Sequence, residues 1–290
     1  MKEIENKVKE LNEAIDLIDL INDSEWKATL NDRKVKELEF HDRDRMNQDS
    51  NDQVDSAHEG DTFEKFYGNK KYYDVVERSN SYVQDWINKE AKGNIFLDYA
   101  CGNGINARHA AKSGAVLSIG FDISGISVKN AIRFSKDENI KNTRFFQADA
   151  ENTKIPDNSI DRIICSGMLH HLDLSYALPE LRRILKPGGK ILAVEALDYN
   201  PAIKLYRMLT PDMRTEWEKA HILSLKDVEF AKRFFKLGRI KYWHVVGYAA
   251  GKFPSLLRVL DLIDKILEKI PLVQRMSWMF TFELINHDEK

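Results

Sequence analysis

The segment LDYACGNG, residues 97–104, ends an apolar run with Asp98 and continues into a turn of small residues. Glycine permits backbone conformations that other residues resist, so such a turn lets the main chain approach a ligand closely. The turn also matches the G-x-G-x-x-A pattern of dinucleotide sites, although that pattern alone is weakly specific. The carboxylate of Asp98 would repel a pyrophosphate and attract an ammonium group. The candidate ligand-binding residues here are Asp98, Ala100, Gly102, Asn103 and Gly104.

Acidic residues also end the next two predicted strands. Asp122 closes AVLSIGFD and can accept hydrogen bonds from both hydroxyls of a ribose. Asp149 closes TRFFQAD and can accept from the exocyclic amine of adenine, while the Ala150 amide is available to a ring nitrogen. Ile123 would flank the adenine, and Cys165, in the next strand, would line the pocket of an amino-acid group. An ammonium, a ribose and an adenine together describe S-adenosylmethionine.

These residues can act together only in a fold that brings the ends of several strands to one edge of a sheet. From residue 94 the sequence has the alternating strand and helix pattern of such a fold. The predicted strands are 94–99, 115–122, 143–149, 159–167 and 190–197, with helices at 106–114, 127–137 and 176–185 and a KPGG turn at 186–189. This alternation predicts βαβ units and a doubly wound parallel sheet whose ligand lies beyond the carboxyl ends of the strands. Further along we expect helices over 200–238, a strand over 240–250 and a strand over 275–285.

Four motifs within residues 94–197 resemble the class I S-adenosylmethionine-dependent methyltransferases. They are LDYACGNG, GFDIS, QADAENTKIPDNSIDRIICSGMLHHL and LRRILKPGGKILAVEA. The resemblance implies an α/β fold with a mostly parallel, seven-stranded Rossmann-like sheet, in which 240–250 and 275–285 supply the sixth strand and an antiparallel seventh. The chain departs from the family at Ala100, where glycine is usual, and we expect a tighter cofactor fit rather than lost binding.

The resemblance also implies a division of the chain. We expect an N-terminal helical arm or cap over 1–90 and a methyltransferase domain over 91–290, with helical additions at 198–240 and 251–272. An apolar stripe predicts a helix over 3–22 that packs on the body or on a partner. The stripe consists of Ile4, Val8, Leu11, Ile15 and Ile18.

Three residues beyond the fourth and fifth strands are candidates for acid–base chemistry. His170 and His171 follow the fourth strand in MLHHL, which resembles small-molecule and quinone methyltransferases, and Glu195 ends the fifth. A neutral imidazole suits the removal of a proton from an oxygen, nitrogen or carbon nucleophile, and Glu195 would orient it or act itself. The alternative is structural, with one histidine capping a helix and the other packed among leucines. We expect no metal site, because no His/Cys cluster has ligand spacing, and no nucleophilic role for Cys165.

The expected acceptor is a small molecule. Neither a basic stripe nor the Asp-Pro-Pro-Tyr motif of amino-methylating nucleic-acid enzymes is present, so we expect no nucleic-acid substrate. The candidate substrate residues are His41, Tyr72, Tyr73, Arg207 and Arg214. The first three belong to the arm, which resembles the cap of relatives, and residues 41–62 lack periodicity and are expected to be mobile or ordered by ligand. For the arginines, the alternative is a structural ion pair.

A second amphipathic helix is predicted over 255–270. Its apolar face consists of Leu256, Leu260, Ile263, Leu267 and Ile270. We expect this face to pack in the core or in a dimer interface. The less favoured alternative is peripheral contact with a membrane, for which the interleaved lysines would be suited.

Charge and composition limit the remaining choices. Residues 1–62 carry 9 basic and 18 acidic residues, or −9, and the rest carry 35 and 28, or +7. With no apolar run of membrane-spanning length, no secretory signal and only two cysteines, we expect a cytoplasmic monomer or homodimer.

A methyltransferase is the favoured function. The alternatives are an NAD(P)-linked oxidoreductase, which Asp98 and Asp149 disfavour, and a catalytically silent S-adenosylmethionine-binding protein, which the histidines and Glu195 disfavour.

Overall fold

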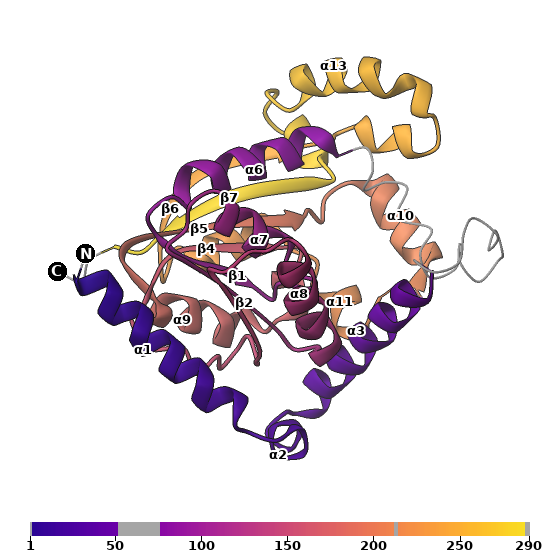
Figure 1. Cartoon of the computed structure of the whole chain (residues 1–290). Helices are drawn as coiled ribbons and strands as arrows, with labels where there is room; N and C mark the ends of the chain where they lie inside the picture. The colour runs from indigo at the N-terminus through magenta and orange to yellow at the C-terminus, as the bar shows by residue number, and fades with distance from the viewer. Residues whose placement is uncertain (1, 52–75, 212–213, 288–290) are drawn as a thin grey trace.

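The computed structural model describes residues 2–51, 76–211 and 214–287, and its core is a single sheet (Figure 1). The described strands are β1 (Ile95–Tyr99), β2 (Leu117–Asp122), β3 (Thr143–Gln147), β4 (Ile160–Ser166), β5 (Leu185–Ala196), β6 (Lys236–Trp243) and β7 (Met279–Ile285). Their order is β3-β2-β1-β4-β5-β7-β6. The first five strands pair in parallel, and β7 runs antiparallel to both β5 and β6, so the sheet is mixed. The predicted α/β class and seven-stranded sheet are confirmed.

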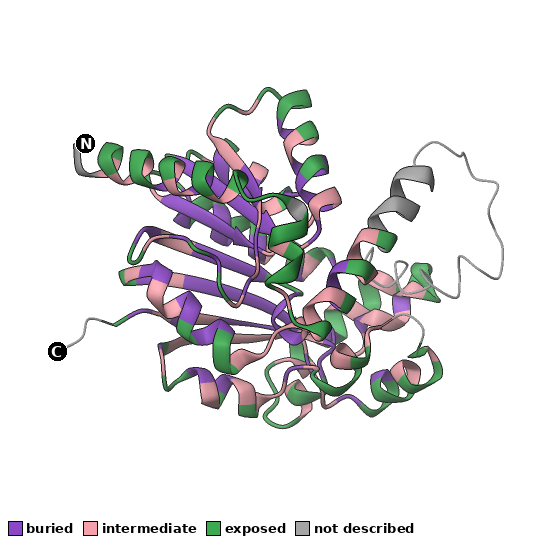
Figure 2. Ribbon diagram, turned by 90° about the horizontal axis from the view of Figure 1, so that it is seen from below, coloured by how far each residue is buried: buried purple, intermediate pink, exposed green. Residues whose placement is uncertain are grey.

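Side chains alternate along the strands and divide the core between the two faces of the sheet. Helices α1 (Lys2–Asp19), α9 (Leu174–Ile184) and α12 (Leu225–Ala231) cover one face, and α6 (Glu77–Glu90), α7 (Ile105–Lys112) and α8 (Gly125–Asp137) cover the other. In β1, Leu97 belongs to the first core and Phe96 to the second. Figure 2 shows the central strands buried and the outer sides of the helices exposed. This double cover leaves the carboxyl ends of the parallel strands as the place for a ligand.

The N-terminal segment packs on the sheet. Leu11 and Ile15 of α1 are fully buried, so the predicted apolar stripe is confirmed as a packing face. The chain then continues through α2 (Asp23–Ala28) into α3 (Asp32–Asn51), which starts where the Asn31 side chain accepts from the Lys34 amide at 3.0 Å. The expectation of an irregular segment from residue 41 is wrong as far as residue 51, because α3 continues to that point. Residues 52–62 lie outside the described residues.

Several boundaries after β4 differ from prediction. The KPGG sequence belongs to β5 rather than to a turn. The predicted helical region contains α10 (Pro201–Leu209), α11 (Glu216–Ala220) and α12, and ends before β6. β6 begins before residue 240 and stops at Trp243, where His244 adopts a positive φ of 64° and the 3-10 helix η3 (Gly247–Gly251) follows. Another 3-10 turn, η5 (Val273–Met276), precedes β7.

The segment predicted as the second amphipathic helix folds as η4 (Pro254–Leu256) and α13 (Leu257–Leu267). Its orientation differs from the one expected, and of the predicted face only Leu260 and Leu267 are half-buried. Leu256, Ile263 and Ile270 of the predicted packing face are exposed, whereas Asp264 is fully buried. The expectation that this face packs into the core is therefore wrong. Across the described parts of the chain, no helix combines the length and apolar character needed to cross a bilayer.

Candidate active site

Two cavities lie beyond the carboxyl ends of the parallel strands. The first, which we name the strand-end cavity, has a volume of about 420 Å³ and is lined by residues after β1, β2 and β3 and by one side of α3. The second, the outer cavity, has a volume of about 300 Å³ and is lined mainly by α10, η3 and the loop around α11. His171 lines the strand-end cavity and His170 lines the outer cavity, and their ring centroids are 4.3 Å apart. The histidine pair thus stands where the cavities meet.

Most of the predicted cofactor residues line the strand-end cavity. They are Asp98, Ala100, Gly102, Asn103, Asp122, Ile123, Asp149 and Ala150. Gly104 and Cys165 are not among its lining residues. Gly104 has a φ of +73°, and a Cβ there would meet Phe145 at 2.7 Å, so this glycine allows α7 to pack on the sheet. Cys165 is fully buried in the core on the α1 side, and Ser166 and Gly167 line the cavity instead.

Asp98 brings an unusual carboxylate to the cavity. It is 1% exposed, and it accepts from the Ala107 amide at 3.1 Å and from the Asn106 side-chain amide at 3.5 Å. Burial raises the pKa of Asp98 to about 7, against the opposing effect of those hydrogen bonds. Nearby, the side-chain oxygen Oδ1 of Asn103 is buried without a hydrogen-bond partner among the described residues. Both groups suit a ligand that brings N–H donors and a positive charge.

The turn after β1 is held by Asp122. Its carboxylate accepts from the Gly102 amide at 2.8 Å and from the Ser124 amide at 2.9 Å, so the ends of β1 and β2 are tied together. A carboxylate can accept about four hydrogen bonds, so this role is compatible with binding hydroxyl groups as well. Ala100 adopts a φ of +56°, a region that costs an alanine roughly 1 kcal/mol, which gives a physical reason for the glycine usual in the family.

Helix α3 contributes a second wall that sequence patterns did not reveal. Lys34 donates to Asp149 at 2.6 Å and pairs with Glu151 at 2.9 Å, while Arg33 donates to the carbonyl oxygen of His171 at 2.9 Å and pairs with Glu151. Asp149 is therefore already engaged by a lysine in addition to its position at the cavity. Lys34 and Arg33 lie in a charged, non-periodic stretch more than 110 residues before their partners, so no local pattern predicts the contact.

His170 and Glu195 form a buried hydrogen-bonded pair. His170 Nδ1 donates to Glu195 Oε2 at 2.7 Å, and Glu195, which is fully buried, accepts from the Met168 and Leu169 amides at 3.0 and 2.8 Å through Oε1. These bonds hold the proton on Nδ1 and leave the lone pair on Nε2. Nε2 lies 3.9 Å from the Glu218 carboxylate at the outer cavity. The predicted pairing of a histidine with Glu195 is present.

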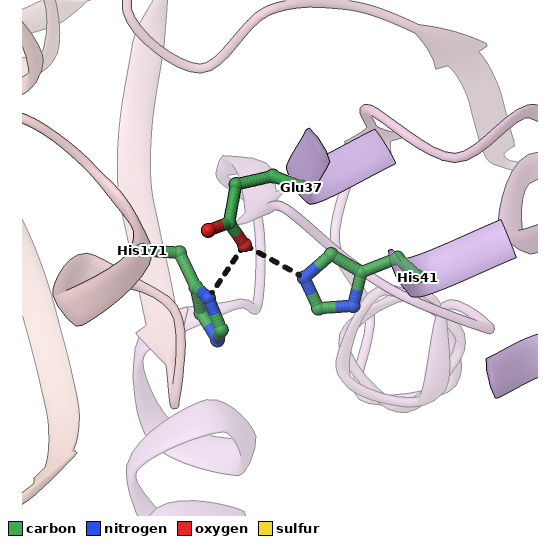
Figure 3. A group of neighbouring side chains, drawn as sticks. All are labelled: Glu37, His41 and His171. Carbon is green, nitrogen blue, oxygen red and sulfur yellow. Dashed lines mark hydrogen bonds and ion pairs between the residues drawn. The ribbon is translucent and has the colours of Figure 1, made fainter. Parts of the chain in front are cut away.

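His171 is held by a different carboxylate, from α3 (Figure 3). Its Nδ1 lies 3.0 Å from Glu37 Oε2, and His41 Nε2 lies 3.7 Å from the same oxygen. Burial lowers the pKa of His171, but Glu37 and the nearby Glu218 act in the opposite direction and raise it overall. Thr215 donates to the other oxygen of Glu37 at 2.5 Å. The α3 helix, the histidine pair and the loop before α11 are thereby joined.

The predicted substrate residues divide into three groups. His41 lines the strand-end cavity rather than the outer one. Arg207 and Arg214 line the outer cavity, where Arg207 lies 3.4 Å from Asp198 and Arg214 lies 3.5 Å from Glu218. The arginines thus make the ion pairs of the structural alternative while also facing the cavity. Tyr72 and Tyr73 lie outside the described residues.

The histidines and glutamates also form two sets with metal-ligand chemistry. Glu37, His41 and His171 are one set, and His170, His171 and Glu218 are the other, each with ligand atoms within 4.8 Å of one another. The sequence-based statement that no cluster has ligand spacing is therefore corrected, because Glu37 and His41 come from α3, far from MLHHL in the chain. In the structure these groups pair with each other through hydrogen bonds and ion pairs.

Comparison with known proteins agrees with the motifs. Residues 97–193 match the family model described as "Methyltransferase domain". Among curated proteins, the uncharacterized methyltransferase YcgJ of Bacillus subtilis is 37% identical over 78 residues, covering 27% of this chain and 31% of that protein. The C-methyltransferase UbiE of Azotobacter vinelandii, named for ubiquinone and menaquinone biosynthesis, is 37% identical over 110 residues, covering 36% of this chain and 43% of that protein. The chain spans about a third of the length of the curated relatives it matches first.

Solved structures agree at the level of the fold. The crystal structure of YcgJ from Bacillus subtilis has a TM-score of 0.51 at 19% identity, covering 72% of this chain and 100% of that one. A phosphoethanolamine N-methyltransferase of Haemonchus contortus in complex with S-adenosyl-L-methionine has a TM-score of 0.55 at 16% identity, covering 78% of this chain and 60% of that one. Residues 97–193 are therefore similar to class I S-adenosylmethionine-dependent methyltransferases, and the chain has the fold of these solved methyltransferase structures.

Proposed function

We propose that this protein transfers a methyl group from S-adenosylmethionine, bound in the strand-end cavity, to a small-molecule acceptor in the outer cavity. The observation that carries the proposal is the position of the histidine pair, with one ring at each cavity. When bound, S-adenosylmethionine supplies an electrophilic methyl group, so the protein has to align the acceptor and take its proton.

The residues of the strand-end cavity fit this cofactor. The buried carboxylate of Asp98 and the unpartnered Oδ1 of Asn103 would bind the ammonium of the methionine part. Asp122 would accept from the ribose hydroxyls, and the Ala150 amide and Ile123 would contact the adenine. A diphosphate is disfavoured by the same carboxylates, because a buried like-charge contact is costly. Helix α3 lines this cavity and bonds to Asp149, Glu151 and His171, which supports a cap role for α3. The expected division into a cap of residues 1–90 and a domain of residues 91–290 does not follow from these contacts, because α1 and α6 pack on the two faces of the sheet.

His170 is the general base in this proposal. Glu195 accepts the Nδ1 proton, so Nε2 at the outer cavity is the atom that receives a proton from the acceptor. The imidazolium that forms is stabilised by the buried Glu195 carboxylate, as in other His–carboxylate pairs. Glu218, held near Arg214, adds a second negative group beside Nε2.

The lining of the outer cavity indicates the type of acceptor. Ile203, Tyr248, Phe253 and Trp278 provide apolar and aromatic surface, while Arg207 and Arg214 lie at the same cavity. Such a lining fits a molecule with an apolar body and a polar end. The names of several relatives, among them a quinone C-methyltransferase and sterol methyltransferases, are compatible with this class. Cytoplasmic location, absence of nucleic-acid substrates and a monomeric or dimeric state remain predictions from the sequence.

Two measurements test the proposed function. Titration calorimetry with S-adenosylmethionine and, separately, with NAD should show binding of the first alone. Incubation with methyl-labelled cofactor and fractionated cell extracts should then transfer label to a small-molecule fraction. Binding of NAD in preference to S-adenosylmethionine would contradict the assignment of the strand-end cavity. Binding of S-adenosylmethionine without transfer to any fraction would instead favour a catalytically silent binding protein.

Substitution Asp122→Ala tests the ribose contact. We expect it to weaken S-adenosylmethionine binding by roughly 1–3 kcal/mol, because two hydroxyl donors lose their acceptor and the Gly102 amide loses its anchor. Calorimetry measures the change. Asp137→Ala, which removes an exposed acid at the end of α8, is the matched control and should leave the affinity unchanged. Equal affinities for both variants would show that Asp122 does not contact the cofactor.

A further inference from the structure

The segment from Phe253 through α13 presents an apolar face to solvent. Six of its large apolar side chains are exposed, and we name this set the α13 face: Phe253, Leu256, Val259, Leu262, Ile263 and Ile266. Leu262 and Ile266 are each 62% exposed. Soluble monomers rarely leave contiguous apolar patches of this kind uncovered, and those that exist are commonly interaction sites.

Polar contacts on the opposite side of α13 fix this orientation. Asp264 is fully buried and accepts from the Val246 and Gly247 amides, each at 2.9 Å. One turn later, the Glu268 carboxylate accepts hydrogen bonds from the two terminal guanidinium nitrogens of Arg78 on α6, at 3.0 and 2.5 Å. It also accepts from the His244 amide at 2.8 Å. The helix is therefore fastened by its acidic side, and its apolar side is turned outward as a consequence.

The exposed charges of the segment that carries the α13 face have one sign. Every exposed charged residue from 251 to 276 is basic, namely Lys252, Arg258, Lys265, Lys269 and Arg275. The acids of the segment, Asp261, Asp264 and Glu268, are half-buried or buried. A second copy of the chain would place the same basic residues opposite each other, which is unfavourable. An apolar stripe flanked by lysine and arginine is instead the pattern of a helix that lies in the interface of an anionic bilayer.

The α13 face adjoins the outer cavity. Lys252 and Phe253, where the face begins, are lining residues of that cavity, and so are Tyr206 and Arg207 of α10. On the same short helix, Met208 and Leu209 are exposed. Figure 1 shows α13 and α10 at the same corner of the molecule, away from α1 and α9. Exposed apolar side chains therefore lie next to the cavity on two sides, at Phe253 and on α10.

We propose that the α13 face docks on an anionic membrane surface and places the mouth of the outer cavity at the lipid–water interface. The proposed docking does not depend on whether the protein transfers a methyl group. A consequence that rests on the proposed function is that the methyl acceptor is an amphipathic molecule dissolved in the bilayer, which enters the outer cavity between α10 and η3 with its apolar body toward the lipid.

Flotation with phospholipid vesicles tests the docking. The full chain should float with vesicles of phosphatidylcholine and phosphatidylglycerol, and weakly or not at all with phosphatidylcholine alone. The double variant L262E/I266E should bind at least about tenfold more weakly, because two apolar anchors become charged. L17E/L20E is the matched control, since Leu17 and Leu20 of the N-terminal segment are 67% and 79% exposed, and it should float like the unchanged chain. The variant K265E/K269E should reduce the preference for phosphatidylglycerol, at about fivefold in affinity per residue.

Three results would overturn the proposal: failure of the unchanged chain to float, equal flotation of L262E/I266E, or a dimer in sedimentation velocity that L262E/I266E converts to monomer without any vesicle binding. The last result would identify the α13 face as an interface between two copies. Calorimetry with S-adenosylmethionine on each variant separates this test from the proposed function. Because the substituted side chains are exposed and none of them lines the strand-end cavity, their replacement should leave the affinity for the cofactor unchanged. If the unchanged chain does not bind S-adenosylmethionine at all, that result contradicts only the proposed function and not the docking.

Discussion

Glu195→Gln should lower kcat for methyl transfer by about a thousandfold or more while leaving the affinity for S-adenosylmethionine nearly unchanged. The amide oxygen of the introduced glutamine can still accept from the Met168 and Leu169 amides, so the local backbone is preserved. Its NH₂ group, however, would donate to His170 Nδ1, where Glu195 now accepts. The proton of the imidazole would then move to Nε2, and the atom that has to take the acceptor's proton would have no lone pair available. A carboxylate-to-amide change that selects the wrong histidine tautomer has losses of this size in other enzymes.

The matched control is Glu37→Gln, which makes the same chemical change beside His171. Because His171 lines the strand-end cavity, we expect this variant to alter the KM for the cofactor and to keep kcat within about tenfold. Initial rates with labelled cofactor measure both parameters. Long-range ¹H–¹⁵N spectra of the histidine rings give a second readout, in which Glu195→Gln should shift the proton of His170 from Nδ1 to Nε2. A large loss of kcat in Glu37→Gln, with little effect of Glu195→Gln, would transfer the role of base to His171.

The residues at the strand ends were predictable because the rule that places them is local. A strand followed by an acid can be recognised within a few residues, and parallel pairing then brings Asp98, Asp122 and Asp149 to one edge of the sheet. The same reasoning placed His170 just after β4 and Glu195 at the end of β5, and the two side chains meet at 2.7 Å. It did not resolve which face of a strand a residue occupies at its end. Cys165 and Ser166 differ by one position, and the cavity has Ser166.

The contribution of α3 was not predictable from its sequence. Its residues are charged and its apolar periodicity is weak, so the stretch gives no indication of a packing face. It is held by ion pairs and hydrogen bonds to groups more than 80 residues away in the sequence, such as Lys34 to Asp149 and Glu37 to His171. The prediction for α13 failed for the opposite reason. Its periodicity is strong, but periodicity identifies two faces without saying which one meets the protein. The partners of its polar face, Arg78 and the backbone after β6, decided the orientation.

Asp98→Asn should weaken binding of S-adenosylmethionine by about 2–4 kcal/mol at pH 8, because the ammonium of the cofactor loses its buried counter-charge. The same residue predicts a pH dependence. Since the pKa of Asp98 is raised to about 7 in the free protein, the carboxyl is mostly protonated below that pH. It has to lose its proton to pair with the ammonium, so affinity should fall about tenfold per unit as the pH drops below 7. Calorimetry in buffers of different ionisation enthalpy should detect the release of roughly one proton per cofactor at pH 6, and Asp98→Asn should abolish it.

Asp98→Asn should raise the stability of the ligand-free protein at pH 8 although it weakens cofactor binding. This difference in sign separates the prediction from a general loss of folding. Because the folded-state pKa of Asp98 lies above the ordinary value of 3.8, its contribution to the free energy of unfolding is full at low pH and is lost as the pH rises through about 7. At pH 8 the ligand-free protein therefore holds a buried, ionised carboxylate whose hydrogen-bond donors, the Ala107 amide and the Asn106 side chain, are both uncharged. Asp98→Asn removes that charge, so the variant should have a higher Tm than the unchanged chain at pH 8 without ligand, and a smaller gain in Tm on adding S-adenosylmethionine. The opposite pair of results would be a lower Tm for Asp98→Asn and an affinity for S-adenosylmethionine that does not depend on pH in either the variant or the unchanged chain. Those results would show that Asp98 is a structural residue and not the counter-charge of the cofactor.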